Sequence, residues 1–362
     1  MSKMIFYKKN NYTTNTMFDY LSDDGTQIKK HAFEKNKELI KFVVPEGVTK
    51  IGHCAFVGCV SLIEVVLPET LREIDSYAFA RCYSLKKIHL PVGIMSLAEQ
   101  VFCECESLET FTIPKNITRI NSGLFSGCDS LKTIKFHDNV QYIANHAFSH
   151  CSSLGSVDIP PKVQEIGEAA FSCCFSLTSI TIPEDVSVIE GWAFQKCSSL
   201  VSVFIPSNVK IIGRYAFRDC TWLVSVILPD QATHIYEKAF KNCPQLSVVV
   251  APRGIGVISI DDHNQGVNGG SLDNVFEGCP LLQGPNYYIP SSPSNRQKAR
   301  SLEFWSPMTH NLCHPKIREW IFFVLLVFQR LDEEFGLPIV VQKIILKSMR
   351  RHELGYPYIM NI

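Results

Sequence analysis

Cysteine and histidine are the residue types in this chain with the most evident capacity for chemistry. The 362 residues include 14 cysteines and 11 histidines, whose side chains bind metal ions, form disulfides or act in catalysis. Ten of the cysteines share one context, three residues after a phenylalanine: Cys59, Cys82, Cys105, Cys128, Cys151, Cys174, Cys197, Cys220, Cys243 and Cys279. Such regularity indicates a repeated packing role.

The spacing of these cysteines predicts neither disulfides nor a metal site. Equivalent atoms in stacked segments lie about 4.8 Å apart, whereas the sulfur atoms of a disulfide lie about 2.05 Å apart. A reduced cysteine is small, prefers burial and donates a weak hydrogen bond to backbone carbonyls. The cysteines outside the series, which have no partner pair at zinc-ligand spacing, are Cys54, Cys103, Cys173 and Cys313. His146 and His150 precede Cys151, but that cysteine belongs to the series and is expected to point inward, so we expect no metal ion and no cofactor.

Catalytic motifs are missing from the sequence. It contains no glycine-rich phosphate loop, no nucleophile elbow, and no histidine and carboxylate pair outside the repeat pattern. The serines that precede the repeated leucines, such as Ser61 and Ser84, are expected in turns. We therefore predict no catalytic residue, and an enzyme or metal protein is the least favoured alternative.

Composition favours a folded protein that does not bind nucleic acid. Hydrophobic residues make up 46% of the chain, enough to bury a core. The 35 lysines and arginines equal the 35 aspartates and glutamates, so there is no excess positive charge to hold phosphates.

The sequence gives no sign of a secretory leader or a membrane span. The opening MSKMIFYKKNNY lacks the roughly 7 to 15 apolar residues of a signal peptide, so we expect a cytoplasmic or otherwise intracellular protein. The apolar run from Trp320 to Phe328 is about half of the roughly 20 residues that a membrane helix needs. It is expected to be the buried face of a helix.

A strict repeat organises most of the chain. A phenylalanine recurs every 23 residues without a slip, at Phe33, Phe56, Phe79, Phe102, Phe125, Phe148, Phe171, Phe194, Phe217 and Phe240. A leucine follows six residues later each time, then apolar residues nine and eleven places on, and most units contain a proline and a closing isoleucine. A period of this length indicates a solenoid, whose apolar positions are buried only by the neighbouring coils. The SLxxIxIP segment predicts one short strand per coil, ended by proline.

These positions together resemble a known repeat family. The segment LTSITIPEDVSVIEGWAFQKCSSL, from Leu177 to Leu200, follows the pattern LxxIxIPxxVxxIGxxAFxxCxxL and resembles the BspA-like leucine-rich repeats, as does the chain from residue 22 to about 250. The resemblance implies a curved right-handed solenoid that binds other molecules and has no active site of its own. The fold class that we predict is an α/β solenoid, a curved stack of 23-residue leucine-rich repeats with a C-terminal helical hairpin.

The residues between the framework positions of each strand are candidates for contact with a partner. At the eighth and tenth places after each phenylalanine, the early coils carry charges, the middle coils carry small polar residues, and the last three carry Phe204, Ile227 and Val250. Trp222 adds to this apolar area, together with Val201 and Val224, and exposed contiguous apolar surface marks interfaces. The alternative is that this area is covered by the chain's own C-terminal helix.

A second candidate surface is the repeat position two residues before the phenylalanine, where Tyr77, Trp192 and Tyr215 stand. Such aromatic side chains either suit a binding hot spot or shield the turn.

The repeat changes at its C-terminal end. The next match, with Phe276, comes 36 residues after Phe240, and the polar, glycine-rich residues 261–271 between them predict a surface loop on an atypical terminal coil. Residues 315–335 and the segment that starts at Leu337 predict two helices that pack as a hairpin. The expected domains are residues 1–21 (N-terminal segment), 22–284 (solenoid), 285–307 (linker) and 308–362 (helical module).

The second predicted helix resembles the first half of an F-box. The resemblance covers about 18 residues and rests on Leu337, Pro338, Val341, Ile345, Leu346, Met349, Glu353 and Leu354. It implies a substrate adaptor for ubiquitin ligation, and the plain alternative is a cap on the end of the solenoid.

The function that we predict is a non-enzymatic scaffold that binds another protein through its exposed strand face. An F-box-like adaptor is the first alternative.

Overall fold

The structure is a computed structural model that describes residues 19–229, 231–251, 255–260, 266–268, 271–282 and 288–290. The chain divides into two compact units, Met1–Arg300 and Ser301–Ile362. All described residues belong to the first unit. The predicted helices at residues 315–335 and beyond Leu337, and with them the F-box-like segment, lie outside the described residues. The domain boundaries assigned from the sequence therefore stay predictions.

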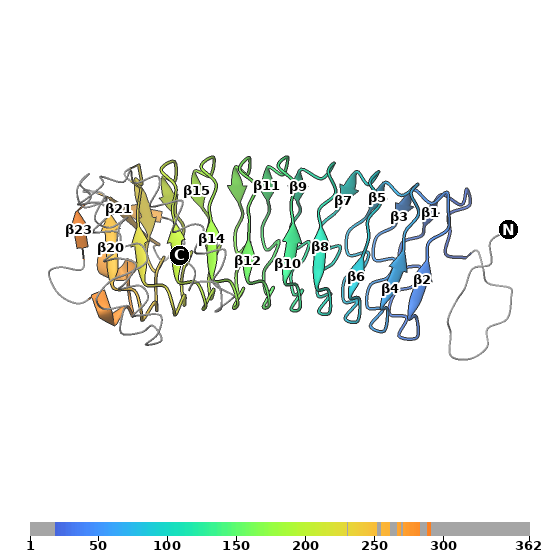
Figure 1. Ribbon diagram of the computed structural model, residues 1–362, viewed down its shortest axis with the longest axis horizontal. Coiled ribbons are helices and arrows are strands. Elements are labelled where there is room, and N and C mark those ends of the chain that lie inside the picture. The colour runs from blue at the N-terminus through green and yellow to red at the C-terminus, as the bar shows by residue number, and fades with distance from the viewer. Residues whose placement is uncertain are drawn as a thin grey trace, which may run out of the picture. The chain divides into compact units, whose positions relative to one another are not determined.

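The first unit is a stack of parallel β coils, each with two short strands, and the coils lie side by side in chain order (Figure 1). The strands of ladder 1 are β1 (Gln27–Ile28), β3 (Lys50–Ile51), β5 (Glu73–Ile74), β7 (Ser96–Leu97), β9 (Arg119–Ile120), β11 (Tyr142–Ile143), β13 (Glu165–Ile166), β15 (Val188–Ile189), β17 (Ile211–Ile212), β19 (His234–Tyr236) and β21 (Gly256–Ile260). The strands of ladder 2 are β2 (Lys41–Val43), β4 (Glu64–Val66), β6 (Lys87–Ile88), β8 (Thr110–Thr112), β10 (Thr133–Lys135), β12 (Ser156–Val157), β14 (Ser179–Thr181), β16 (Ser202–Phe204), β18 (Ser225–Ile227), β20 (Val248–Ala251) and β23 (Tyr288–Pro290).

The pairing register confirms the predicted solenoid. Most strands of the regular coils pair in parallel with the strand 23 residues further on, for example Gln27 with Lys50 and Phe204 with Ile227. The pairing is interrupted between β7 and β9 in ladder 1, and between β6 and β8 and between β10 and β12 in ladder 2. The strand predicted from SLxxIxIP is the ladder 2 strand. The ladder 1 strand was not predicted, because most of its members are two residues long and too short to show an alternating pattern.

The repeated phenylalanines stack on one another through the whole array. Ring centroids of consecutive coils are 4.9 Å to 5.9 Å apart from Phe33 to Phe240, and Phe276 continues the stack at 5.5 Å from Phe240. All of these rings except the first are buried. Identical side chains therefore pack above and below each other, as the strict period predicts.

The repeated cysteines complete the hydrogen bonding of this core. The Cys151 thiol donates to the carbonyl oxygen of Phe125 in the preceding coil at 3.2 Å, while the Cys128 amide donates to the same oxygen at 3.1 Å. A buried carbonyl has two lone pairs to satisfy, and the small thiol reaches the second one. The same thiol contact recurs from Cys59 to Cys279, which confirms the predicted role, and the thirteen described cysteines are free thiols.

Each coil also turns through two left-handed residues, two places before and two places after the phenylalanine. Those that are not glycine have φ between 53° and 63°. Their amides donate to the next coil, for example Tyr77 to the Glu99 carbonyl at 3.2 Å and Arg81 to the Cys103 carbonyl at 2.8 Å. Left-handed residues other than glycine cost roughly 1 kcal/mol each, and this third ladder of hydrogen bonds holds them in place. It was not predicted, although Gly58 and Gly127 mark the second position.

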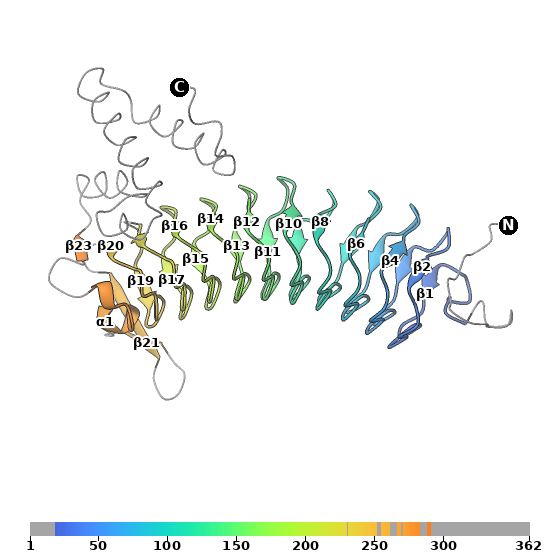
Figure 2. The same ribbon diagram turned by 60° about the horizontal axis from the view of Figure 1, so that its bottom comes forward.

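The C-terminal end of the array departs from the predicted loop. Strand β21 pairs with the antiparallel strand β22 (Gly266–Asn268), which lies within the segment expected to be a surface loop. A return strand satisfies the outer edge of β21, which would otherwise present unpaired backbone groups. Helix α1 (Leu272–Val275) and the short 3₁₀ helix η1 (Pro280–Leu282) follow, and Figure 2 shows them at this end. Within the described residues, none of the helices has the length and apolar character of a membrane span.

Candidate protein-interaction surface

The ladder 2 strands present alternate residues to the core and to solvent. In β16 and β18 the central residues Val203 and Val226 are buried, whereas Phe204 is exposed and Ile227 half-buried. This alternation is the one predicted from the framework positions. Strand β14 carries Thr181 at the place where β16 carries Phe204, so the surface changes from polar to apolar within one coil.

Four side chains form a C-terminal apolar patch, defined here as Val201, Phe204, Trp222 and Ile227. Val201, Phe204 and Trp222 are 48%, 42% and 53% exposed. Phe204 pairs with Ile227 in the next coil. The Val224 amide donates to the Val201 carbonyl at 3.0 Å, so Trp222, two residues before Val224, belongs to the coil that follows that of Val201. Val250 continues the register beside Ile227, but its side chain is not among those described.

Large apolar residues are also exposed outside this patch, at places that the sequence analysis did not single out, and Val92 and Met95 are the most exposed of them, at 84% and 67%. Phe175 is 42% exposed, and its carbonyl accepts the amide of Ser199, which stands two residues before Val201 of the patch. At the other end of the array, Ile40, Ile63 and Val66 are 41% to 45% exposed. Ile40 and Ile63 stand seven residues after the repeated phenylalanine, as Val201 does in its own coil. The sequence analysis compared this repeat position only in the last coils.

Trp192 and Tyr215 form a separate pair in a different segment of the coil. They follow β15 and β17 of ladder 1 and occupy the first left-handed position, with ring centroids 5.7 Å apart. The guanidinium carbons of Arg214 and Arg218 lie 4.7 Å and 5.2 Å from the Tyr215 centroid, within range of cation–π attraction. The six candidate residues predicted from the sequence therefore do not form one site. Phe204, Ile227 and Val250 lie on ladder 2 strands, Trp222 lies in the turn that precedes β18, and Trp192 and Tyr215 lie on the turns that follow ladder 1.

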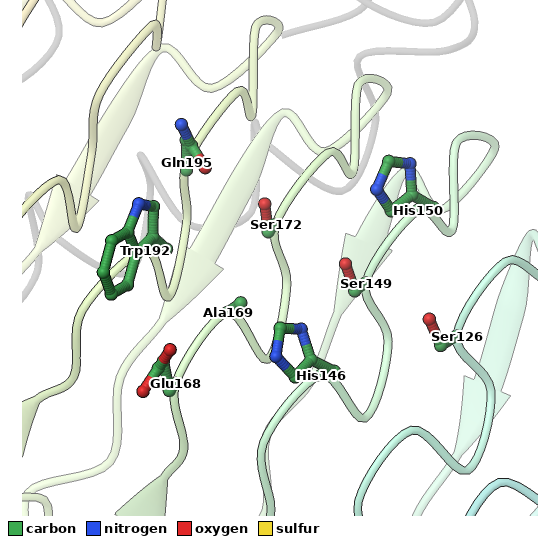
Figure 3. Close-up of a pocket in the computed structure, with 9 residues that line it drawn as sticks. All are labelled: Ser126, His146, Ser149, His150, Glu168, Ala169, Ser172, Trp192 and Gln195. Atoms are coloured by element: carbon green, nitrogen blue, oxygen red, sulfur yellow. The ribbon is translucent and has the colours of Figure 1, made fainter.

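A groove beside Trp192 runs along the same turns (Figure 3). Its volume is about 480 Å³, and it is lined by Ser126, His146, Ser149, His150, Glu168, Ala169, Ser172, Trp192 and Gln195. These residues come mainly from two rows of equivalent repeat positions, two places before and one place after the phenylalanine. Its lining is mostly hydroxyl, imidazole and carboxylate groups, unlike the largely apolar walls of typical small-molecule sites.

Burial makes the repeated thiols poor nucleophiles. It raises the pKa of Cys59 to about 12 and that of the half-buried Cys103 to about 11, and it raises the pKa of fully buried thiols such as Cys128 well above the usual value. The thiolate is the reactive form of cysteine. These thiols therefore stay protonated at neutral pH and serve packing. Cys279 is the exception in the series, because its hydrogen bond with Cys243 lowers its pKa.

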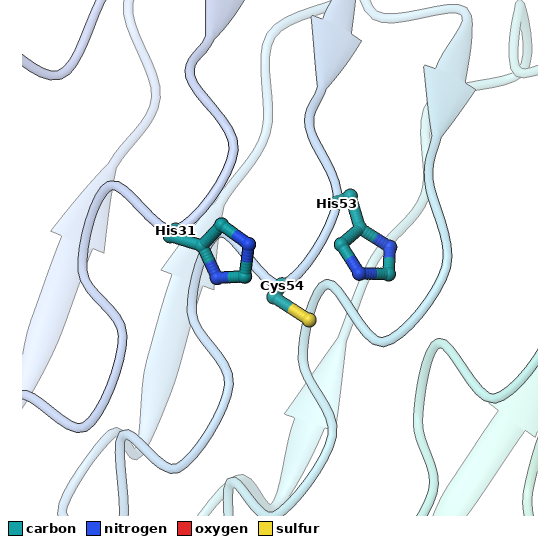
Figure 4. A group of neighbouring side chains, drawn as sticks. All are labelled: His31, His53 and Cys54. Carbon is teal, nitrogen blue, oxygen red and sulfur yellow. The ribbon is translucent and has the colours of Figure 1, made fainter.

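One cluster of possible metal ligands lies near the N-terminal end of the array. His31, His53 and Cys54 place a nitrogen or sulfur atom each within 4.8 Å of one another, and both imidazole rings lie beside the Cys54 sulfur (Figure 4). His31 Nδ1 is 2.8 Å from a carboxylate oxygen of Glu34. Sequence spacing predicted no metal site here.

Comparisons with known proteins found similar solved structures but no curated relative. Among solved structures, a leucine rich cell surface protein from Faecalibacterium prausnitzii is 26% identical, with 75% of this chain and 85% of that chain covered and a TM-score of 0.45. A leucine-rich repeat protein from Bacteroides ovatus is 22% identical (78% and 92% covered, TM-score 0.39), and the pneumococcal vaccine antigen PcpA is 18% identical (73% and 65% covered, TM-score 0.43).

The repeat family itself matches over most of the described array. The BspA type leucine rich repeat region is found in six copies, over residues 26–155 and 120–247. These matches span more than half of the 362 residues. The chain therefore belongs to the BspA-type leucine-rich repeat family.

Proposed function

We propose that this chain is a non-enzymatic scaffold that binds another protein through its C-terminal apolar patch. The observation that supports this most is the exposure of Val201, Phe204 and Trp222 in neighbouring coils. Full burial of such a side chain against a partner is worth roughly 1.5 to 3 kcal/mol. In contrast, the middle coils present Thr110 and Thr112 at the corresponding strand positions.

The partner best suited to this patch is a protein with an apolar contact surface. The face is built on rigid paired strands, and aromatic anchors on a rigid support form binding hot spots. The half-buried serines of β16 and β18, Ser202 and Ser225, supply hydroxyl groups at its edge. The balanced charge of the chain argues against nucleic acid as the partner.

A non-enzymatic role is part of the same proposal. It is supported by the protonated state of the repeated thiols from Cys59 to Cys220, whose pKa burial raises, and by a sequence without catalytic motifs. The intracellular location expected from the sequence stays a prediction, which fractionation of the native cell would test.

The test is a charge-introducing double variant, Phe204→Glu with Ile227→Glu. The wild-type chain is first used to capture partners from the native cell, and the purified partner is then titrated against wild type and variant. We expect at least tenfold weaker binding by the variant with the coils still folded. The melting temperature should fall modestly, because Phe204 is 42% exposed but Ile227 is half-buried and pairs with Phe204, so the two new charges face each other. The matched control, Thr112→Glu, places the same charge at the same repeat position in a middle coil and should bind as wild type does.

Two results would contradict the proposal. Equal binding by the double variant and wild type would exclude the patch as the contact surface. A lower melting temperature together with new protease cleavage within residues 285–362 would show that the patch packs against the chain's own C-terminal residues.

A further inference from the structure

The cluster of His31, His53 and Cys54 is the strongest unassigned group of chemically active side chains in the described residues. Their donor atoms lie within 4.8 Å of one another. A tetrahedral zinc ion with bonds of 2.0 to 2.3 Å holds its ligand atoms roughly 3.3 to 3.6 Å apart. Because neither imidazole is buried, side-chain rotation can close the difference of about 1 Å without moving the backbone.

The coil geometry explains why these three residues meet. His31 and Cys54 occupy the same left-handed position in consecutive coils, with φ of 59° and 55°, so their side chains leave the turn one above the other. The amide of His31 donates to the carbonyl of His53 at 2.9 Å, which fixes the separation of the two coils. His53 precedes Cys54 and brings its ring against that of His31, with centroids 5.6 Å apart.

Glu34 prepares His31 to act as a ligand. Its carboxylate accepts a hydrogen bond from Nδ1 of His31 at 2.8 Å, which leaves the lone pair on Nε2 free. Metal-bound histidines commonly donate their other ring N–H to a carboxylate in this way. The carboxylates of Glu34 and Asp75 also act electrostatically on the Cys54 thiol, so the site has negative charges close to it as well as the nearby Lys35.

We propose that His31, His53 and Cys54 bind one zinc ion, with Glu34 orienting His31 and the fourth position open to solvent. Two imidazoles and one thiolate form a nitrogen and sulfur donor set that suits zinc. The metal replaces the thiol proton of Cys54, which passes to solvent, so the step is a simple exchange without oxidation. The ion ties the first coil to the second at the N-terminal end of the array, where the first coil has one neighbouring coil among the described residues.

Zinc stoichiometry on the full chain tests this proposal. Purified protein is loaded with zinc, freed of excess metal by gel filtration and measured for bound zinc by elemental analysis. We expect Cys54→Ser and His53→Gln to hold one zinc ion fewer per chain than wild type. Glu34→Gln should keep the site with about 10- to 100-fold weaker affinity, as removal of such an orienting group typically does.

Two matched variants serve as controls. His146→Gln changes the histidine at the same repeat position as His31, where the next coil has Ala169 in place of cysteine. Cys103→Ser changes a cysteine that is half-buried like Cys54. Both should bind as much zinc as wild type, and an ion held elsewhere in the chain would appear in every variant alike.

Two readouts separate a bound ion from an effect on folding. Cobalt in place of zinc should give a thiolate-to-metal charge-transfer band that Cys54→Ser lacks. Zinc should also slow hydrogen exchange at the amides of His31 and Phe33, which bond to the second coil, about tenfold in wild type but not in Cys54→Ser. The proposal is overturned if wild type and Cys54→Ser hold the same amount of zinc, if the cobalt band survives in Cys54→Ser, or if zinc leaves exchange in wild type unchanged.

Discussion

Replacement of Phe148 by alanine tests whether the phenylalanine stack stabilises the array. Phe148 is fully buried, and its ring stacks on Phe125 at 5.4 Å and on Phe171 at 5.3 Å, with the edge of Phe136 at 6.0 Å. A buried phenylalanine replaced by alanine costs about 3 to 5 kcal/mol, and each aromatic pair contributes about 0.5 to 1.5 kcal/mol beyond the buried area. Since two stacked pairs are lost, we expect a loss at the upper end, about 5 kcal/mol.

A terminal member of the stack gives the matched comparison. Phe276 stacks on Phe240 at 5.5 Å and is 7% exposed, so within the described residues it has one stacked neighbour instead of two. Phe276→Ala should therefore cost about 3 kcal/mol. The conservative Phe148→Leu keeps an apolar side chain and loses only the ring pairs, which predicts a loss of about 1 to 3 kcal/mol.

Urea unfolding followed by two probes makes the result informative. Far-UV circular dichroism reports on all coils, whereas the four tryptophans all lie at or after residue 192 and report only on the C-terminal part. Because each coil contacts only its neighbours, Phe148→Ala should make the circular dichroism transition biphasic and leave the tryptophan transition closer to that of wild type. A loss below about 1 kcal/mol, or equal losses for Phe148→Ala and Phe276→Ala with coincident transitions, would refute the nearest-neighbour account.

Two further predictions follow from the backbone and the thiols. Burial raises the pKa of the repeated thiols from Cys59 to Cys220 above 9.0, so their stabilising effect is complete below about pH 9 and is lost as the pH rises. The free energy of unfolding should fall by up to about 1.4 kcal/mol per pH unit for each such thiol. Cys151→Ala should therefore show a shallower slope than wild type in urea titrations between pH 8 and 10. Lys196 is exposed with φ of 59°, so Lys196→Gly should raise the free energy of unfolding by up to about 1 kcal/mol. Lys210→Gly, at an exposed residue outside the left-handed set, should lower it, and equal effects of the two glycines would contradict the reasoning.

The sequence predicts the core of this fold almost completely because the core repeats. The positions of Phe148 and Cys151 recur every 23 residues, and a period of that kind has only one economical solution, stacked coils with equivalent neighbours. The inward and outward sides of strands such as β16 follow from the same register. The short strand β17 was missed because two residues leave no alternation to detect, and the left-handed turns were missed because Trp192 and Tyr215 give no glycine signal.

The surface was predictable only in part, because it does not repeat. Phe204 and Ile227 could be placed on the solvent side of their strands, and the structure finds Phe204 exposed and Ile227 half-buried. The sequence could not show that Trp192 and Tyr215 belong to another segment of the coil, since that depends on the path of the chain between β15 and β16. It also overlooked Phe175, which lies outside the strand positions that were compared.

The histidine and cysteine cluster shows how a solenoid changes the meaning of sequence distance. Paired zinc ligands in many structural sites have two to five residues between them in the sequence. By that rule His31 and Cys54 would not be recognised as ligands of one ion. In this fold, residues 23 positions apart are stacked neighbours, as the pairing of Ile28 with Ile51 shows, and the His31 amide bonds to the carbonyl of His53, which precedes Cys54. Ligand sets must therefore be sought among residues that share or adjoin a position in consecutive repeats. The positions equivalent to His31, His53 and Cys54 five repeats further on are His146, Glu168 and Ala169. Alanine cannot replace the cysteine ligand there. Zinc should therefore bind at the first place and not at the second, although both begin with a histidine on the same left-handed turn.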